Sequence, residues 1–258
     1  MLIGDNRQGQ LGLSCCEIIG GFHSTSRFPD FRKISFGYRH TAIVDHHNKL
    51  YMFGSNDCGQ LGRKGSEESA SGSILSPRKD EITRDGIENN PHKPVLALMI
   101  VARQNVIKVS CGKDFTLILD SSRKVWASGC NSFGQLGTGD QNNRQSFTQV
   151  MFPGDNQSTS VTNHISCGEG HSMIVDSEGA VWSFGNNCYF QLGRITRGDI
   201  SKTPKKLSQL PITISKTSSG HFHSVLLSRC GTELLLCGTF KPSHNNRIFF
   251  SFFFSSFT

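Results

Sequence analysis

Short apolar runs alternate with polar turns along most of the chain. Four of these runs, at residues 42–44, 117–119, 173–175 and 225–227, begin five residues after a glycine. In three of them a polar turn leads into a second run, at 50–53, 125–128 and 181–184. Two β-branched or aromatic-rich runs joined by a short turn are typical of a β-hairpin. The pattern therefore predicts a chain built from repeated hairpins.

A nine-residue motif occurs four times and is the most regular feature of the sequence. Its copies occupy residues 4–12, 54–62, 129–137 and 185–193, with glycine at both ends, asparagine third and leucine eighth. Glycine tolerates a positive φ and close backbone approach, and asparagine can cap its own turn through its side chain. We interpret the motif as a structured turn between two strands, anchored in the core by Leu61, Leu136 and Leu192.

A second set of glycines has a fixed distance from these turns. Gly37, Gly112 and Gly168 each lie 17 residues before the first glycine of a motif, and Gly220 lies 18 residues before Gly238. This unit resembles the repeat of the regulator of chromosome condensation family, whose members fold as seven-bladed β-propellers. The resemblance covers roughly Gly4 to Gly238, and a period of about 50 residues is typical of propellers or solenoids.

We therefore expect an all-β fold, a β-propeller of four-stranded antiparallel blades that is incomplete, with three full repeats and partial ones at each end. The repeat region is assigned to residues 1–240, with repeats near 1–33, 34–105, 106–163, 164–215 and 216–240. Little sequence precedes the first motif, so the first half of that repeat is missing. We expect either that another segment supplies it or that the chain is a fragment.

Two segments depart from the repeat. Residues 65–93 are rich in Ser, Glu, Asp and Asn and predict a surface insert, with a strand resuming at 94–99. In the family's Ran-directed exchange factor a protruding hairpin contacts the GTPase, so the resemblance makes the insert a candidate contact, with a tolerated loop as the simpler interpretation. Residues 241–258 end in a Phe/Ser run, which we interpret as a disordered or artefactual tail from a mis-spliced gene model. A tail that dips into a membrane is the alternative.

Composition narrows the class of protein. Lysine and arginine number 27 against 20 aspartates and glutamates, a net charge of +7 that weakly favours acidic partners. The nine cysteines include no C-x-x-C pair, and Cys111 and Cys167 occupy a repeat position that predicts core packing. Reduced thiols favour a cytoplasmic or nuclear protein. No apolar run approaches the ~20 residues that span a bilayer, so no membrane span is predicted.

One basic cluster stands out as a candidate partner-binding site. It carries a single aspartate, Asp199, and consists of Arg194, Arg197, Lys202, Lys205 and Lys206. Lysine and arginine in such a cluster can bind a phosphate or an acidic partner. It lacks the interleaved aromatic residues that stack on nucleic-acid bases. A solvated loop between strands is the alternative interpretation.

No catalytic, cofactor-binding or metal-binding constellation is predicted. His40, His171 and His223 occupy one repeat position, which is Phe115 in the remaining copy. A position that accepts phenylalanine indicates packing or hydrogen bonding rather than metal ligation. The chain also lacks a G-x-x-x-x-G-K-[ST] phosphate-binding loop.

Three functions remain, and we favour a non-catalytic propeller that acts as a protein-interaction or regulatory module. The resemblance implies a second, guanine-nucleotide exchange on a Ran-like small GTPase. The third is chromatin association through the basic loops. The sequence from Gly37 to Thr41 is also similar to the Gly-Trp-Arg-His-Thr motif of the family's plant UV-B photoreceptor, but Tyr38 replaces its tryptophan. Photoreception is therefore disfavoured.

Overall fold

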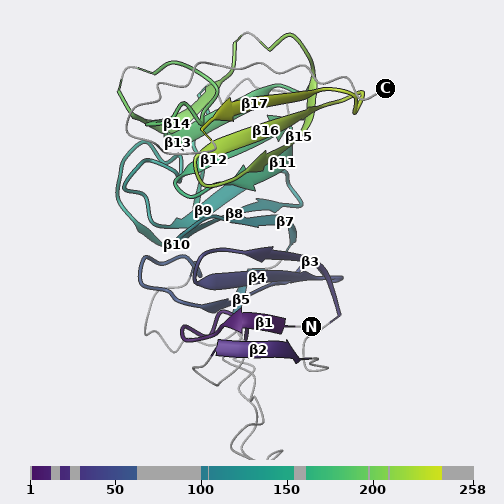
Figure 1. Cartoon of the computed structure of the whole chain (residues 1–258), viewed down its shortest axis with the longest axis vertical. Helices are drawn as coiled ribbons and strands as arrows, with labels where there is room; N and C mark the ends of the chain where they lie inside the picture. Colours follow the sequence, from purple (N-terminus) through teal and green to yellow (C-terminus); the bar gives the residue numbers. More distant parts are fainter. Residues whose placement is uncertain are drawn as a thin grey trace, which may run out of the picture.

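The computed structural model describes residues 2–12, 18–23, 30–62, 100–103, 105–153, 161–196, 198–208 and 210–239. Within these ranges all regular secondary structure is β-strand, and the strands form separate antiparallel sheets. Figure 1 shows the sheets stacked in chain order, with the N-terminal sheet (purple) and the C-terminal sheet (yellow-green) at opposite ends. The stack is not closed into a ring. The prediction of an all-β, incomplete propeller is confirmed.

Three sheets are complete blades of four strands, joined in sequence order from the inner to the outer strand. Blade A contains β3 (Phe31–Phe36), β4 (His40–Asp45), β5 (Leu50–Gly54) and β6 (Ile100–Arg103). Blade B contains β7 (Val106–Cys111), β8 (Phe115–Asp120), β9 (Val125–Gly129) and β10 (Arg144–Gln149). Blade C contains β11 (Thr162–Cys167), β12 (His171–Asp176), β13 (Val181–Asn186) and β14 (Ile200–Lys206).

Partial blades lie at both ends, as expected. At the C-terminal end, blade D consists of β15 (Ile214–Ser219), β16 (His223–Ser228) and β17 (Leu234–Gly238). At the N-terminal end, β1 (Leu2–Asp5) pairs with β2 (Ile18–His23). These two strands flank the first copy of the nine-residue motif, so they correspond to the outer half of a blade.

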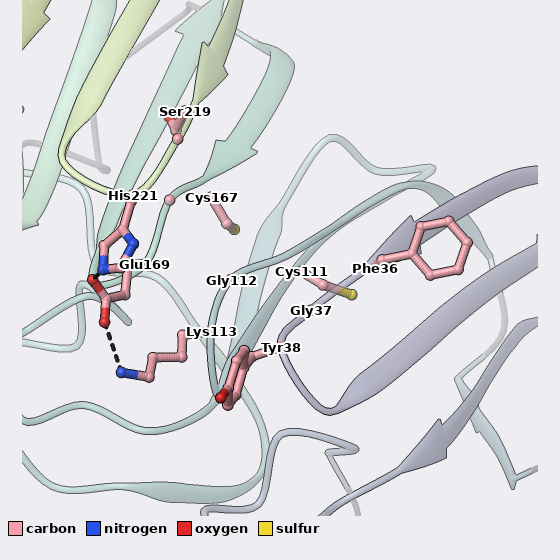
Figure 2. Close-up of a pocket in the computed structure, with 12 residues that line it drawn as sticks. Phe36, Gly37, Tyr38, Cys111, Gly112, Lys113, Cys167, Glu169, Ser219 and His221 are labelled. Carbon is pink, nitrogen blue, oxygen red and sulfur yellow. Dashed lines mark hydrogen bonds and ion pairs between the residues drawn. The ribbon is translucent and has the colours of Figure 1, made fainter. Parts of the chain in front are cut away.

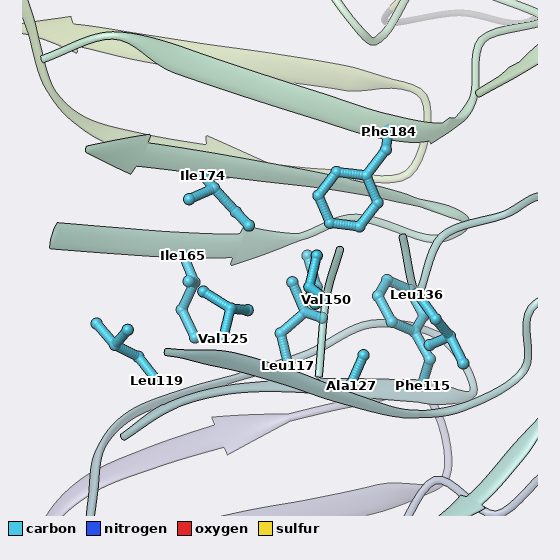
Figure 3. Packing of buried hydrophobic residues seen from close by; sticks show 11 residues of the cluster. Phe115, Leu117, Leu119, Val125, Ala127, Leu136, Val150, Ile165, Ile174 and Phe184 are labelled. Carbon is cyan, nitrogen blue, oxygen red and sulfur yellow. The ribbon is translucent and has the colours of Figure 1, made fainter. Parts of the chain in front are cut away.

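The core lies between blades rather than inside any one of them. Every residue of β4, β8 and β12 is buried, because each second strand is covered by a neighbouring blade on both faces. Three clusters of buried apolar side chains fill the spaces between blades A and B, B and C, and C and D. In the B–C cluster, Phe115 and Leu117 of blade B face Phe184 of blade C (Figure 3). Stacking is therefore what supplies each blade with a core.

Candidate partner-binding surfaces

Each nine-residue motif is a turn between the third and fourth strands, closed by its own side chains. In residues 129–137, Asn131 Oδ1 accepts a hydrogen bond from the Leu136 N–H at 3.0 Å, and Gln135 Oε1 accepts one from the Phe133 N–H at 2.9 Å. The other three copies repeat both bonds. The leucine anchor is buried in every copy, as predicted. The closed turn leaves its fourth residue exposed, namely Arg7, Asp57, Ser132 and Cys188.

A buried hydrogen-bond latch ties each turn to the next blade. The Thr116 hydroxyl of blade B donates to the Gln60 carbonyl in the turn of blade A at 2.8 Å, and His40 Nε2 lies 2.9 Å from the Thr116 hydroxyl oxygen. Because the single hydroxyl proton serves Gln60, His40 must donate from Nε2. Hydroxyls at the equivalent position contact Gln10, Gln135 and Gln191. These glutamine carbonyls and hydroxyls therefore join neighbouring blades.

The repeated histidines pack and hydrogen-bond within the blade stack. His171 is fully buried, and its Nε2 lies 2.8 Å from Ser224 Oγ. Burial lowers the pKa of His40 to about 4 and that of His171 to about 3, so both rings are neutral at neutral pH. A Cβ on Gly37 would lie 2.2 Å from His40 Cε1, which explains the recurring glycine as space for this ring.

The buried aspartates at the opposite end of the blades also serve the scaffold. Asp120 Oδ1 accepts a hydrogen bond from the Lys124 N–H at 3.0 Å, and its Oδ2 accepts one from Trp126 Nε1 at 2.8 Å. Asp45 and Asp176 make the same kind of bonds, with Tyr51 and Trp182 as the aromatic donors. Trp126 and Trp182 both lie in third strands, and their bonds to these aspartates hold the hairpin turn.

A cavity of about 530 Å³ lies where the inner strands end (Figure 2). The residue after each opening glycine lines it, so blades A to D contribute Tyr38, Lys113, Glu169 and His221 in turn. Lys113 Nζ lies 2.7 Å from Glu169 Oε1, and His221 contacts the other carboxylate oxygen. Tyr38 is 69% exposed beside Lys113. The cavity therefore presents an exposed aromatic ring next to a side-chain network, Lys113–Glu169–His221, that spans blades B, C and D.

The predicted basic cluster divides into two environments. Lys202, Lys205 and Lys206 lie exposed on the outer strand β14. The Arg194 guanidinium is half-buried and donates to the Ser183 hydroxyl and carbonyl, both at 3.1 Å. Burial lowers the Arg194 pKa. The lysines are free to meet a partner, whereas Arg194 holds its own blade, and the partner-binding role of the cluster stays a prediction.

Several predicted features fall outside the described ranges. They are the insert at 65–93, the strand at 94–99, Arg197 and the tail at 241–258. In the part of the chain that is described, no group of three or more His, Cys, Asp or Glu side chains is placed to hold a metal ion. The same residues include no helix long and apolar enough to cross a membrane.

The repeat pattern and the blade geometry agree with two models of one family. The regulator of chromosome condensation (RCC1) repeat matches residues 47–119, 124–175 and 178–227, and a second model of the same repeat matches 31–60, 106–135 and 163–191. The chain belongs to the RCC1 repeat family. The matches at 124–175 and 178–227 each run from the third strand of one blade through the second strand of the next. An RCC1 repeat is thus offset from the blade by two strands.

This RCC1 chain spans only part of the length of each of three similar known proteins. The mouse X-linked retinitis pigmentosa GTPase regulator is 35% identical over 162 residues, which are 62% of this chain and 13% of that protein. Among solved structures, human WBSCR16 has a TM-score of 0.69 at 20% identity, covering 92% of this chain and 55% of that one. Saccharomyces cerevisiae Prp20p, described with its binding properties to Gsp1p and histones, has a TM-score of 0.63 at 20% identity, with 89% and 53% covered. These two structures show the fold.

Sequence reasoning missed the Lys113–Glu169–His221 network at the cavity. Glu169 and His221 are 52 residues apart and belong to different blades, so no local pattern joins them. One signal was present: both directly follow an opening glycine, as do Tyr38 and Lys113. Residues at one repeat position meet around a propeller axis. Comparing the charges of the four residues that follow the opening glycines would therefore have located this side-chain network.

Proposed function

We propose that this RCC1-repeat chain is a non-catalytic protein-interaction or regulatory module. The observation that carries the proposal is that its recurring polar residues and its variable polar residues occupy different environments. Those that recur in every blade are committed to the scaffold, as the asparagine turns and the hydroxyl latches show. Those that differ between blades, such as Tyr38 and the β14 lysines, are exposed. Variable loops on a rigid scaffold are where binding usually resides. A cytoplasmic or nuclear location belongs to the same proposal.

Guanine-nucleotide exchange on a small GTPase is the second candidate. It is favoured by the similarity to a GTPase regulator and to Prp20p, which is described with binding to Gsp1p. Exchange needs no covalent chemistry, because a protein that prefers the nucleotide-free GTPase accelerates release. Chromatin association is a third, weaker candidate, which rests on the exposed lysines and on the histone binding described for Prp20p.

One experiment separates the first two candidates. The full chain is immobilised and offered a panel of purified small GTPases, each stripped of nucleotide, loaded with GDP or loaded with a GTP analogue. Release of labelled GDP is followed in parallel. We expect capture of a partner with no acceleration of GDP release. Acceleration by the chain, together with capture of only the stripped form, establishes exchange and overturns the non-catalytic assignment.

The same assay tests the predicted basic site. Lys202→Glu combined with Lys205→Glu reverses two exposed charges on β14, and we expect it to weaken partner capture. Lys49→Glu combined with Lys124→Glu makes the same charge change at the exposed hairpin turns of blades A and B. If both pairs weaken capture equally, net charge rather than β14 is responsible.

A further inference from the structure

Basic side chains occupy one position on the inner strands of all four blades A to D. The four residues are Lys33, Lys108, His164 and Lys216, each four residues before the opening glycine. Each pairs with the second strand at the same place, directly after the register shift that every inner strand carries. Inner strands of adjacent blades contact one another, and Figure 1 shows them along one side of the stack. The repeat therefore aligns these residues into a basic row across the blades.

The row concentrates positive charge without local compensation. Among the described residues, Lys33, Lys108 and Lys216 form no ion pair with a carboxylate. Burial lowers the Lys108 pKa, and the charges of Lys33, Arg123 and Lys216 lower it further. Burial also lowers the pKa of His164, and the charges of all three lysines add to that effect. Nearby charges of one sign along a protein wall focus the field and attract ligands of the opposite sign.

An apolar surface adjoins the basic row. On β3, Phe36 lies three residues beyond Lys33, roughly 10 Å along an extended strand. Phe36 is 59% exposed and lines the cavity, as Tyr38 does, and Figure 2 shows the two rings pointing in different directions at its rim. At the Phe36 position the other blades have Cys111, Cys167 and Ser219. Side chains three residues apart in a strand point to opposite faces of the sheet, so a ligand reaches both the cations and the aromatic rings only by extending along the inner strands.

We propose that the inner-strand side of the stack binds an acidic peptide segment of a partner protein. Glutamate or aspartate side chains meet the basic row, and apolar side chains of the same extended segment contact the exposed Phe36 and Tyr38 rings at the rim of the cavity. This inference rests on the proposed function and names the chemistry of the partner. A peptide fits better than a compact phosphate, because phosphate chemistry makes no use of the exposed rings. It fits better than duplex nucleic acid, because Lys108 and His164 are half-buried in the wall.

The probe is a labelled peptide in which glutamate alternates with leucine, offered to the immobilised full chain. Its controls replace every glutamate with lysine or every leucine with serine. We expect binding that salt weakens, lost with the lysine peptide and reduced with the serine peptide. Lys108→Gln is expected to weaken binding about tenfold, the scale of a charge-assisted contact. Lys49→Gln removes the same charge from an exposed turn and is expected to leave binding unchanged.

Two further measurements make the outcome decisive. Lys108 Nζ donates to the Asn163 carbonyl, so a merely structural lysine predicts that Lys108→Gln lowers the melting temperature. Our proposal predicts an unchanged or raised one, since a repelling charge is removed. Tighter binding of tripolyphosphate or duplex DNA than of the peptide overturns the peptide assignment. Peptide binding abolished by Lys202→Gln and untouched by Lys108→Gln moves the site to β14, which overturns this inference and leaves the proposed function standing. Capture of a GTPase by a chain that does not bind the peptide likewise overturns this inference and leaves the proposed function standing.

Discussion

Phe190 departs from the pattern of its turn motif. It is the sixth residue of its turn, where the other copies have Gly9, Gly59 and Gly134 at φ values of 74°, 89° and 76°. Phe190 adopts a φ of 60° at the same place. An L-residue in this region carries a cost of about 1–2 kcal/mol relative to glycine. The fold therefore imposes the turn geometry even where the sequence resists it.

A pair of substitutions at Phe190 isolates this strain. We expect Phe190→Gly to be more stable than Phe190→Ala by about 1 kcal/mol, because both lose the ring and only glycine relieves the positive φ. The measurement is the urea midpoint of each variant at equal m-value. As a control, the Gly/Ala difference is measured at Ser132, which is exposed in the turn of blade B and has no positive φ. Equal stability of the two Phe190 variants contradicts the strain.

The buried histidines predict acid sensitivity. The folded-state pKa values of His40 and His171, about 4 and about 3, lie below the value of about 6.5 in an unfolded chain. The neutral histidines therefore contribute fully to the free energy of unfolding above pH 6.5. That contribution is lost as pH falls from 6.5 toward 4. The loss is roughly 1.4 kcal/mol per pH unit for each histidine in this window.

The test compares the free energy of unfolding at pH 7 and pH 5. We expect a marked loss in the native sequence and a smaller loss in His171→Phe, which introduces the residue that blade B has at this position, Phe115. His46→Phe is the control, because it replaces a histidine that lies exposed in a hairpin turn. Identical pH slopes in the native chain and in His171→Phe refute the assignment.

At the scale of the element, what could be read from the sequence was local. The hairpin of β8 and β9 and the turn at 129–137 were predictable because strand, turn and anchor follow one another within a few residues. The inner strands were not identified, because β3 and β15 mix charged and apolar residues and carry no continuous apolar run. The cross-blade latches and the basic row join residues that the fold alone brings together.

The latch between blades A and B gives an element-scale prediction. Thr116 is fully buried and serves both Gln60 and His40. Thr116→Val keeps the shape and removes both bonds. His40 Nε2 then loses its partner and the Gln60 carbonyl keeps only the longer bond from the Ser128 hydroxyl at 3.4 Å, so we expect a loss of about 1–3 kcal/mol in urea unfolding. Thr116→Ser restores the hydroxyl found at Ser172 and Ser224 and should recover most of it. In a His40→Phe background, Thr116→Val should lower the free energy of unfolding by less than it does in the native chain. An equal loss in both backgrounds argues against the latch.

At the scale of the whole molecule, one interface is used again and again. The apolar clusters A–B, B–C and C–D repeat the same packing, and the repeat offset makes each RCC1 unit contribute to two blades. Stability in such a stack is the sum of neighbour contacts, as in other repeat proteins. The end blades have fewer neighbours, and among the described residues β17 pairs with β16 alone.

The open stack leads to a prediction of self-association. A strand edge with unpaired N–H and C=O groups is a template for another chain, so we expect the isolated chain to aggregate or to depend on a partner. Light scattering coupled to size exclusion should show mass rising with concentration. Leu234→Lys puts a charge on the half-buried edge strand β17 and is expected to reduce the association. Val161→Lys makes the same change at a 43%-exposed site inside the stack and should not. A monodisperse monomer that melts cooperatively at every concentration would show that the open blades are stable without a further strand.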